Sequence, residues 1–193
     1  MSVQLDGRRE RGRVRRELLL EAAVSVIASR GASELTHRSV ATAASVSLAS
    51  VTYHFPGIDD LRSAAFDFAG SRVGLAFRAL VEAQGDDVSG IPELAADYVV
   101  TLVRENRKDT LAVYEMILAA SHDEALKPIA QELHGHLADL LMPYVGMPAA
   151  AQAVGSSIQG LILTHLAGGV SDETAALHEA VADLVHRFRR PAL

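Results

Sequence analysis

Residues 36–55 constrain the fold of this chain more than any other segment, because they predict two short helices joined by a tight turn. Thr36 is a candidate N-cap, since its hydroxyl can accept a hydrogen bond from a free backbone N–H of the next turn. Small apolar residues then follow at helical spacing: Val40, Ala41 and Ala44. After a break in this pattern, Ser47 is a candidate N-cap for the second helix.

The second helix is too short and too polar to bury itself, and it ends in an aromatic cluster. Val51 and Phe55 lie four residues apart and are expected to face inward. The outward positions are Leu48, Ala49, Ser50, Thr52, Tyr53 and His54. A short helix presented in this way by a helix-turn-helix fits the major groove of DNA. The same periodicity also fits an ordinary helical hairpin inside an all-α protein.

The charge distribution favours the nucleic-acid interpretation. Residues 1–58 contain eight arginines and five acids, a net charge of +3, whereas the rest of the chain has ten basic and nineteen acidic residues, a net charge of −9. Six of these arginines lie close to the N-terminus: Arg8, Arg9, Arg11, Arg13, Arg15 and Arg16. A basic segment next to an exposed helix suits phosphate binding at one end of the chain. We expect residues 1–12 to form a flexible arm, which also fits a solvated tail.

Residues 15–61 resemble the DNA-binding domain of the TetR family of transcriptional regulators. The matching residues, in the family's order and spacing, are Leu19, Ala22, Ala23, Val26, Ile27, Gly31, Thr36, Val40, Ala41, Ala44, Val46, Ser47, Tyr53, His54, Phe55 and Leu61. The resemblance implies an all-α homodimer that binds a palindromic operator in double-stranded DNA. It also implies a repressor that an unknown small-molecule effector releases, although activation fits the same pattern.

The resemblance also implies roles for single residues. Arg38 is placed to contact a guanine edge, with a phosphate clamp or a surface ion pair as alternatives. The expected phosphate ligands are Thr36, Ser47, Thr52, Tyr53 and His54. Leu48 and Ala49 can contact thymine methyl groups, and Ser50 shares their helix. Phe55 is expected in the core rather than at the DNA.

Three positions depart from the family pattern. Ser45 stands where the turn usually has glycine, which carries a backbone cost if φ is positive. Thr52 replaces the usual tyrosine, and Ile58 replaces a lysine at the start of the fourth helix. The lost lysine removes one expected phosphate contact from each subunit.

The periodicity predicts an all-α protein of about nine helices. We expect a basic arm (1–12), a three-helix DNA-binding domain (13–58) and a helical effector-binding and dimerisation domain (59–193). The helices outside residues 36–55 are predicted at about 13–30, 59–84, 91–106, 109–121, 123–145, 148–167 and 172–189. Gly31 is expected to end the first helix.

The last two predicted helices are candidates for dimerisation. Ala153, Ser156, Ser157 and Gly160 form a stripe of small residues that permits close approach of another helix. Leu177, Val181 and Leu184 belong to an apolar stripe on the following helix. The family resemblance places a four-helix interface between two subunits here, while internal packing in a monomer is the alternative.

The middle helices supply the candidates for effector binding. An apolar interior with a few polar groups is typical of a ligand pocket. The polar candidates are Tyr98, Tyr114, Glu115, His134, Gln159 and His165. The same residues also fit an ordinary core with hydrogen-bonded histidines. Glu115 needs a partner if it is buried.

Composition and motifs argue against other classes. The chain has no cysteine, no apolar run long enough to cross a membrane and no signal-peptide pattern, so we expect a cytoplasmic protein without membrane contact. No catalytic or metal-binding motif is present, so we expect no enzyme activity, cofactor or metal. A helical adaptor of the same fold without specific DNA binding, or a small helical enzyme, remains the alternative.

Overall fold

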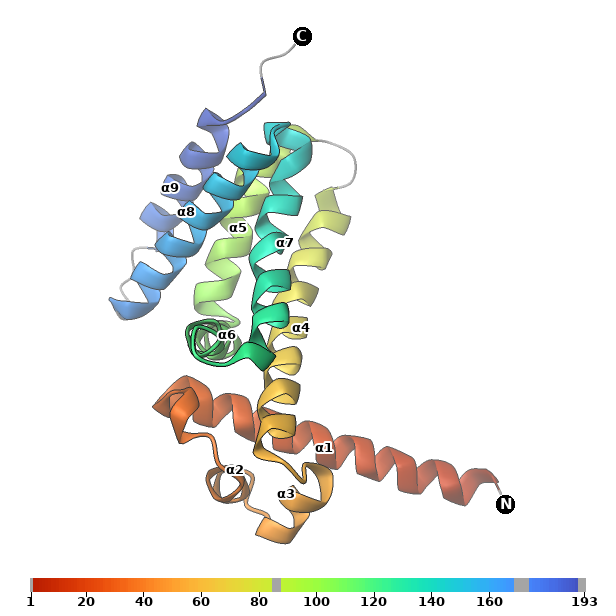
Figure 1. Ribbon diagram of the computed structural model, residues 1–193. Coiled ribbons are helices and arrows are strands. Elements are labelled where there is room, and N and C mark those ends of the chain that lie inside the picture. The colour runs from red at the N-terminus through yellow and green to blue at the C-terminus, as the bar shows by residue number, and fades with distance from the viewer. Residues whose placement is uncertain (1, 85–87, 169–173, 191–193) are drawn as a thin grey trace. The chain divides into compact units, whose positions relative to one another are not determined.

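The computed structural model describes residues 2–84, 88–168 and 174–190, without the side chains of residues 2–8, 76–81, 83, 84, 88, 129, 132–134 and 136. Over these residues the protein is all-α, as predicted, with nine α-helices (Figure 1). The chain forms two compact units. The first unit comprises Met1–Ala69 and Leu111–Leu126, and the second comprises Gly70–Thr110 and Lys127–Leu193.

The first unit is built on three helices, α1 (Ser2–Arg30), α2 (His37–Ala43) and α3 (Leu48–His54). It also contains the first part of α4 (Ile58–Gln84) and most of α6 (Arg107–Ala119), with the short 3₁₀ helices η1 (Ala32–Glu34) and η3 (Glu124–Leu126). Its fully buried side chains come from all of these α-helices: Leu19, Ile27, Val40, Val51, Leu61, Phe66 and Met116.

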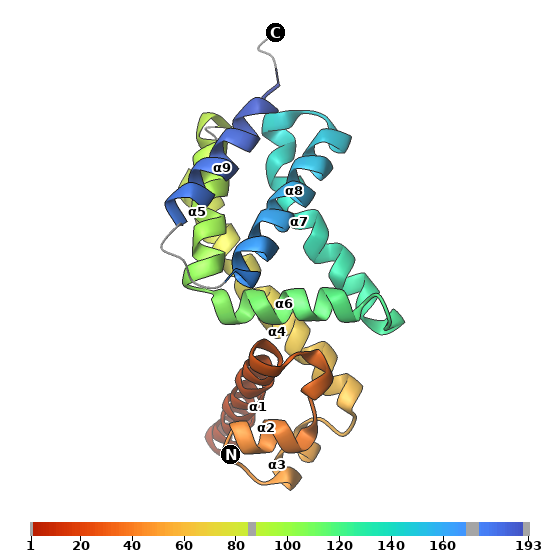
Figure 2. The ribbon, with the colours of Figure 1, turned by 90° about the vertical axis from the view of Figure 1, so that its left-hand side faces the viewer.

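The second unit is a bundle of longer helices. After the 3₁₀ helix η2 (Val88–Gly90) come α5 (Ile91–Arg104), α7 (Lys127–Val145), α8 (Pro148–Ala167) and α9 (Thr174–Arg187). Helix α5 packs along α9, and α7 packs along α8 (Figure 2). The buried apolar side chains of this core include Val99, Leu141, Ile158, Ile162, Val181 and Val185.

Helix α1 begins at Ser2, whereas the sequence predicted its start near residue 13. The helix is therefore longer than predicted. Arg13 bonds to Glu10 and Glu17 at 2.6 Å each, at the three- and four-residue spacings that support a helix. The same guanidinium lowers the pKa of Glu10. The helix ends as predicted, since Gly31 adopts φ +91° and its N–H bonds to the carbonyl oxygen of Ile27 at 2.8 Å.

The predicted boundary at residue 58 does not coincide with the boundary between the two units. Helices α4 and α6 are each continuous, and the boundary falls inside them, after Ala69 and after Thr110. A helix of 27 residues such as α4 is about 40 Å long, which exceeds the diameter of one small domain. Both helices therefore contribute residues to both units.

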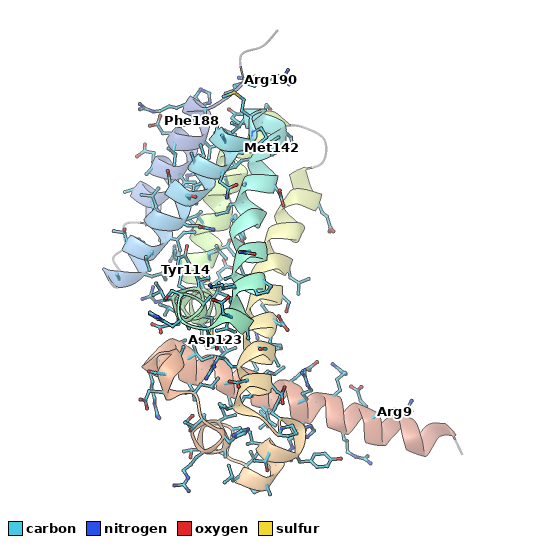
Figure 3. All side chains as sticks on the ribbon, viewed as in Figure 1. Arg9, Tyr114, Asp123, Met142, Phe188 and Arg190 are labelled. Carbon is cyan, nitrogen blue, oxygen red and sulfur yellow. The ribbon has the colours of Figure 1, made fainter. Side chains whose placement is uncertain are left out.

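Two polar contacts hold the returning segment Leu111–Leu126 to the rest of the first unit. The Glu115 carboxylate accepts a hydrogen bond from the backbone N–H of Ala32 at 3.2 Å, and Asp123 pairs with Arg62 at 2.9 Å. A Cβ atom at Gly31 would lie at an ordinary contact distance of 3.4 Å from the same Glu115 oxygen, so the positive φ is what favours glycine here. Figure 3 labels Asp123 close to the end of α6.

A buried charge lies beside the boundary in the second unit. Asp109 on α6 is 2% exposed and pairs with Arg72 on α4 at 3.1 Å. Because a buried carboxylate is costly without a partner, this pair ties the two helices to each other within the second unit. Among the described residues, no helix is long and apolar enough to cross a membrane.

Candidate DNA-binding surface

The two predicted N-caps of residues 36–55 are present. The Thr36 side chain accepts a hydrogen bond from the Ser39 N–H at 3.0 Å, and the Ser39 hydroxyl accepts one from the Thr36 N–H at 2.9 Å. At the second helix, the Ser47 hydroxyl accepts a hydrogen bond from the Ser50 N–H at 3.2 Å. These bonds satisfy backbone groups that a short helix leaves open at its first turn.

The turn between α2 and α3 has the strained residue that the sequence indicated. Ser45 has φ +53°, and it is the one non-glycine residue with positive φ in the described part of the chain. The next N–H, of Val46, bonds back to the carbonyl oxygen of Ala41 at 3.0 Å. A left-handed serine costs about 1–2 kcal/mol relative to its preferred conformations, so the turn persists because its neighbours are fixed.

Helix α3 presents its polar side outward, as predicted. Val51 and Phe55 are buried, whereas Tyr53 is 82% exposed. Leu48, Ala49 and Thr52 are also exposed, and Ser50 and His54 are half-buried. The Tyr53 and His54 rings meet edge to face with their centroids 5.2 Å apart. With a single buried residue, this helix offers the side formed by Leu48, Ala49, Thr52 and Tyr53 to a partner.

The hydroxyl groups on this surface differ in what they can donate. Ser47 accepts a bond at its own cap, so its proton is available to a phosphate oxygen. The Thr52 hydroxyl donates to the carbonyl oxygens of Leu48 at 3.2 Å and Ala49 at 3.3 Å. The Thr36 hydroxyl likewise donates to the Ser39 hydroxyl at 3.1 Å, so Ser47 has the more available proton of these three.

Arg38 lies on α2 and is exposed. Its side chain makes no hydrogen bond or ion pair with another described residue, which leaves the guanidinium free to contact a base or a phosphate. Its backbone carbonyl oxygen accepts a bond from the Thr42 hydroxyl at 3.0 Å, which fixes the backbone beneath it.

Two residues contact Phe55 at the end of α3, and the sequence did not predict either contact. The His37 ring nitrogen Nε2 lies 2.8 Å from the carbonyl oxygen of Phe55, 18 residues away. The Arg16 guanidinium lies over the Phe55 ring, 4.9 Å from its centroid. Neither contact has a local sequence signal, because each joins residues on different helices.

Arg16 and Phe55 also line a groove of about 440 Å³ in the first unit. The start of α4 contributes Asp59, Asp60 and Asp67 to it. Asp59 bonds to Arg62 at 3.1 Å, and Asp60 accepts a bond from the Gly57 N–H at 3.2 Å. The groove thus joins one guanidinium and three carboxylates beside the end of α3.

The residues predicted to bind an effector do not all lie in one unit. Tyr114 and Glu115 belong to the first unit, where Glu115 bonds to the backbone of Ala32, and their role in effector binding stays a prediction. The polar partner that Glu115 requires is this backbone N–H. Tyr98, Gln159 and His165 lie in the second unit, and the side chain of His134 is outside the described residues. Burial raises the pKa of Tyr98, so its hydroxyl stays neutral.

The residues predicted at a dimer interface also separate into two groups. The small residues of α8 are exposed, namely Ala153, Ser156, Ser157 and Gly160. Leu177 and Val181 of α9 are buried, because this side of α9 packs on α5 within the same chain. Their place in a dimer interface stays a prediction, and Leu184 is half-buried.

Comparison with protein families covers both units. Residues 19–65 match the family described as bacterial regulatory proteins, tetR family. Residues 86–188 match the family described as tetracyclin repressor-like, C-terminal domain. Among curated proteins, none matches the chain.

Solved structures similar to this chain cover nearly all of it. The multidrug binding protein EbrR complexed with imidazole gives a TM-score of 0.74 at 28% identity, over 93% of this chain and 97% of that chain. EbrR complexed with malachite green gives a TM-score of 0.73 at 29% identity, over 91% and 98%. A TetR family member from Streptomyces coelicolor A3 gives a TM-score of 0.76 at 29% identity, over 88% and 97%.

Proposed function

Since the chain belongs to the TetR family of bacterial regulatory proteins, we propose that it binds a palindromic operator as a homodimer and that a small-molecule effector releases it. The observation that carries the proposal is the exposed polar surface of α3, held by a cap at one end and by His37 at the other. A major groove admits one helix, and side chains near its start contact base edges.

Within this surface we assign two kinds of contact. Arg38 is the candidate for base recognition, because a free guanidinium can donate two hydrogen bonds to guanine. Tyr53, His54 and Ser47 are the candidates for phosphate binding, together with, more weakly, Thr36 and Thr52. Leu48 and Ala49 offer apolar contact to thymine methyl groups, and Ser50, on the same helix, is half-buried.

The exposed side of α8 supports dimerisation. Ala153, Ser156, Gly160 and Leu163 lie on one side of this helix, and all four are exposed. We call them the outer face of α8. A Cβ atom placed on Gly160 would meet nothing within 4 Å, so this glycine packs against none of the described residues of other elements. Small residues on an exposed face permit the close approach of a second helix, and a two-fold dimer would place two α3 helices on a palindrome.

The effector site is proposed for the second unit. This unit contains most of the segment that matches the tetracyclin repressor-like C-terminal domain, and the similar EbrR is described in complexes with imidazole, malachite green, ethidium and proflavin. Tyr98, Gln159 and His165 are the described polar candidates there. By analogy with those complexes we propose an aromatic effector.

Two helices connect effector binding to DNA release in this proposal. Helices α4 and α6 both continue from the second unit into the first, and Arg72 binds Asp109 where they leave the second unit. A change in the second unit that moved these helices would move the segments that carry Arg62 and Glu115. A ligand shifts this equilibrium only by the difference in its affinity for the two states.

The test begins with DNA selection by the intact protein from a randomised duplex library. We expect a palindromic duplex to be enriched and to bind more tightly than a scrambled duplex of equal length. Recovery of no duplex even in dilute salt would overturn the regulator proposal and favour the adaptor alternative.

Effector release is then tested with malachite green. We expect it to bind the free protein more tightly than the protein on its selected duplex, by the same factor as it weakens DNA binding. The scrambled duplex controls for direct dye binding to DNA. Equal dye affinity in both states would exclude this dye as an effector without affecting the DNA-binding proposal.

A further inference from the structure

One arginine of the second unit lies between two helices without a carboxylate partner. Arg107 begins α6, and its Nη2 donates a hydrogen bond at 3.2 Å to the carbonyl oxygen of Leu166 in the last turn of α8. Figure 2 shows this end of α8 beside the first turn of α6. The Arg107 side chain is half-buried. Its other terminal nitrogen, Nη1, is fully buried and has no hydrogen-bond partner among the described residues.

In this respect Arg107 differs from other arginines of the chain. Arg62, Arg72 and Arg187 each pair with an aspartate, at 2.9, 3.1 and 2.8 Å. The acid closest to Arg107 along α6 is Asp109, and its carboxylate pairs with Arg72 instead. Within the described part of the chain, no acidic side chain pairs with Arg107.

The bond to Leu166 accounts for only one side of the guanidinium. A cation at the end of a helix is favourable, so the position of Nη2 has a structural reason. Nη1 has none, because a buried donor without an acceptor costs free energy, and the cost is larger for a charged group. Such groups are rare in folded proteins, and each one calls for an explanation. An acceptor supplied from outside the chain would remove this cost.

We propose that Arg107 binds an anionic group of the effector, namely a carboxylate carried by an aromatic scaffold. The inference rests on the proposed function and names the chemical class of its effector. The two oxygens of a carboxylate match the planar fork of a guanidinium, so they can accept from Nη1 and from the second N–H of Nη2. His165, a predicted effector residue, directly precedes Leu166 in α8.

The position of Arg107 also suits control of DNA binding. Arg107 belongs to α6, and this helix continues into the first unit as part of Leu111–Leu126. An anion held by Arg107 therefore acts directly on a helix that both units share. If the anion binds more tightly in one position of α6 than in another, it shifts the protein toward that position.

Three small aromatic probes test the charge of the effector: benzoate, benzamide and benzamidinium. They share one ring and nearly the same planar shape, but they are an anion, a neutral molecule and a cation. Binding to the intact free protein is measured by isothermal titration at constant salt, and by the rise in unfolding temperature that a ligand of the folded state causes. We expect benzoate to bind most tightly and benzamidinium most weakly.

Arg107→Gln removes the charge and keeps an amide N–H for the Leu166 carbonyl oxygen. It should weaken benzoate binding by about 10–100-fold and leave the affinity for benzamide nearly unchanged. Arg104→Gln is the matched control, because it removes the same charge from an exposed residue at the end of α5. It should leave the order of the three probes as it is in the unmodified protein.

Stability in the absence of ligand gives a test that does not depend on the probes. Because Nη1 has no acceptor in the free protein, Arg107→Met should raise the unfolding temperature. A purely structural role beneath α8 predicts the opposite, since the bond to the Leu166 carbonyl oxygen is lost. A lower unfolding temperature for Arg107→Met would therefore overturn the inference.

Two further results would overturn it. One is equal affinity for benzoate and benzamide, and the other is undiminished benzoate binding by Arg107→Gln. On the selected duplex, benzoate should weaken DNA binding by the factor by which the duplex weakens benzoate binding, and benzoate without this effect would refute the effector assignment. Failure of the unmodified protein to select any duplex is a separate result. It would remove the proposed function, whereas the binding of anions to the free protein would still be measured.

Discussion

Helices α3 and α8 both expose small residues, but the two units stabilise them in different ways. Helix α3 buries one side chain, Val51, whereas α8 buries Ala151, Val154, Gly155, Ile158, Ile162 and Leu166. Helix α3 depends on groups at its two ends, Ser47 and the His37 contact to Phe55. Helix α8 depends on packing along its length. In α3, contacts at the two ends take the place of the packing that α8 has along its length.

The largest expected effect is a loss of stability when leucine replaces Gly155 of α8. The same substitution at Gly160 of this helix is expected to leave the fold intact. A Cβ atom on Gly155 would lie 3.4 Å from the Ala138 backbone nitrogen, whereas one on Gly160 would meet nothing within 4 Å. Gly155→Leu should therefore lower the free energy of unfolding by about 3 kcal/mol or more through overpacking. Chemical denaturation measures this loss.

Gly160→Leu should leave the subunit folded, since glycine within a helix is itself unfavourable by about 0.5–1 kcal/mol. Its effect should appear in sedimentation equilibrium, as a weaker dimer, because a large side chain separates the two outer faces of α8. An unchanged dimer with Gly160→Leu would move the subunit interface to another surface.

The next effect concerns the outward side of the helix-turn-helix. Arg38→Ala should reduce discrimination among bases at one operator position by about 1–3 kcal/mol, because a bidentate contact to guanine is lost. Tyr53→Phe should weaken binding to all duplexes alike. Binding to single-base variants of the selected duplex measures both. Uniform losses for both substitutions would contradict the division into base and phosphate contacts.

A smaller effect is expected at the start of α3. Ser47→Ala removes the side-chain acceptor for the Ser50 N–H and should destabilise the first unit by about 1 kcal/mol. Ser47→Asn keeps an acceptor and should retain stability, so the pair separates capping from other effects. Equal unfolding midpoints for the two variants would show that the ends of α3 do not limit its stability.

The smallest expected effect lies in the turn before α3. Ser45 has φ +53°, so Ser45→Gly removes the strain of a left-handed serine but adds freedom to the unfolded chain. The balance should stabilise the protein by about 0.5 kcal/mol, measured by thermal unfolding. A loss of stability would show that the Ser45 side chain contributes a contact that its backbone conformation does not reveal.

The sequence predicted local features better than contacts between distant segments. The caps at Thr36 and Ser47, the burial of Val51 and Phe55 and the strained turn at Ser45 all follow from neighbouring residues, and the structure has them. Helix α8 begins and ends as predicted, since proline and glycine mark its ends. These features need only periodicity and backbone preferences.

The features that the local sequence does not specify depend on tertiary packing. Glu115 is near Tyr114 in sequence, but its partner is Ala32, 83 residues away. Leu177 and Val181 form an apolar stripe, and periodicity alone does not distinguish a stripe that packs on α5 from one that packs on a second subunit. The contacts of Arg16 and His37 with Phe55 likewise join separate helices.

The return of Leu111–Leu126 to the first unit has a consequence for protein engineering. A fragment that stops at Ala69 lacks Met116, Glu115 and Asp123, which complete the core and polar contacts of that unit. A chimaera joined once in α4 would combine a foreign helix-turn-helix with an unmatched α6. Grafting a new operator specificity onto this scaffold therefore requires exchanging two separate stretches of polypeptide, or restricting the changes to the solvent side of α2 and α3.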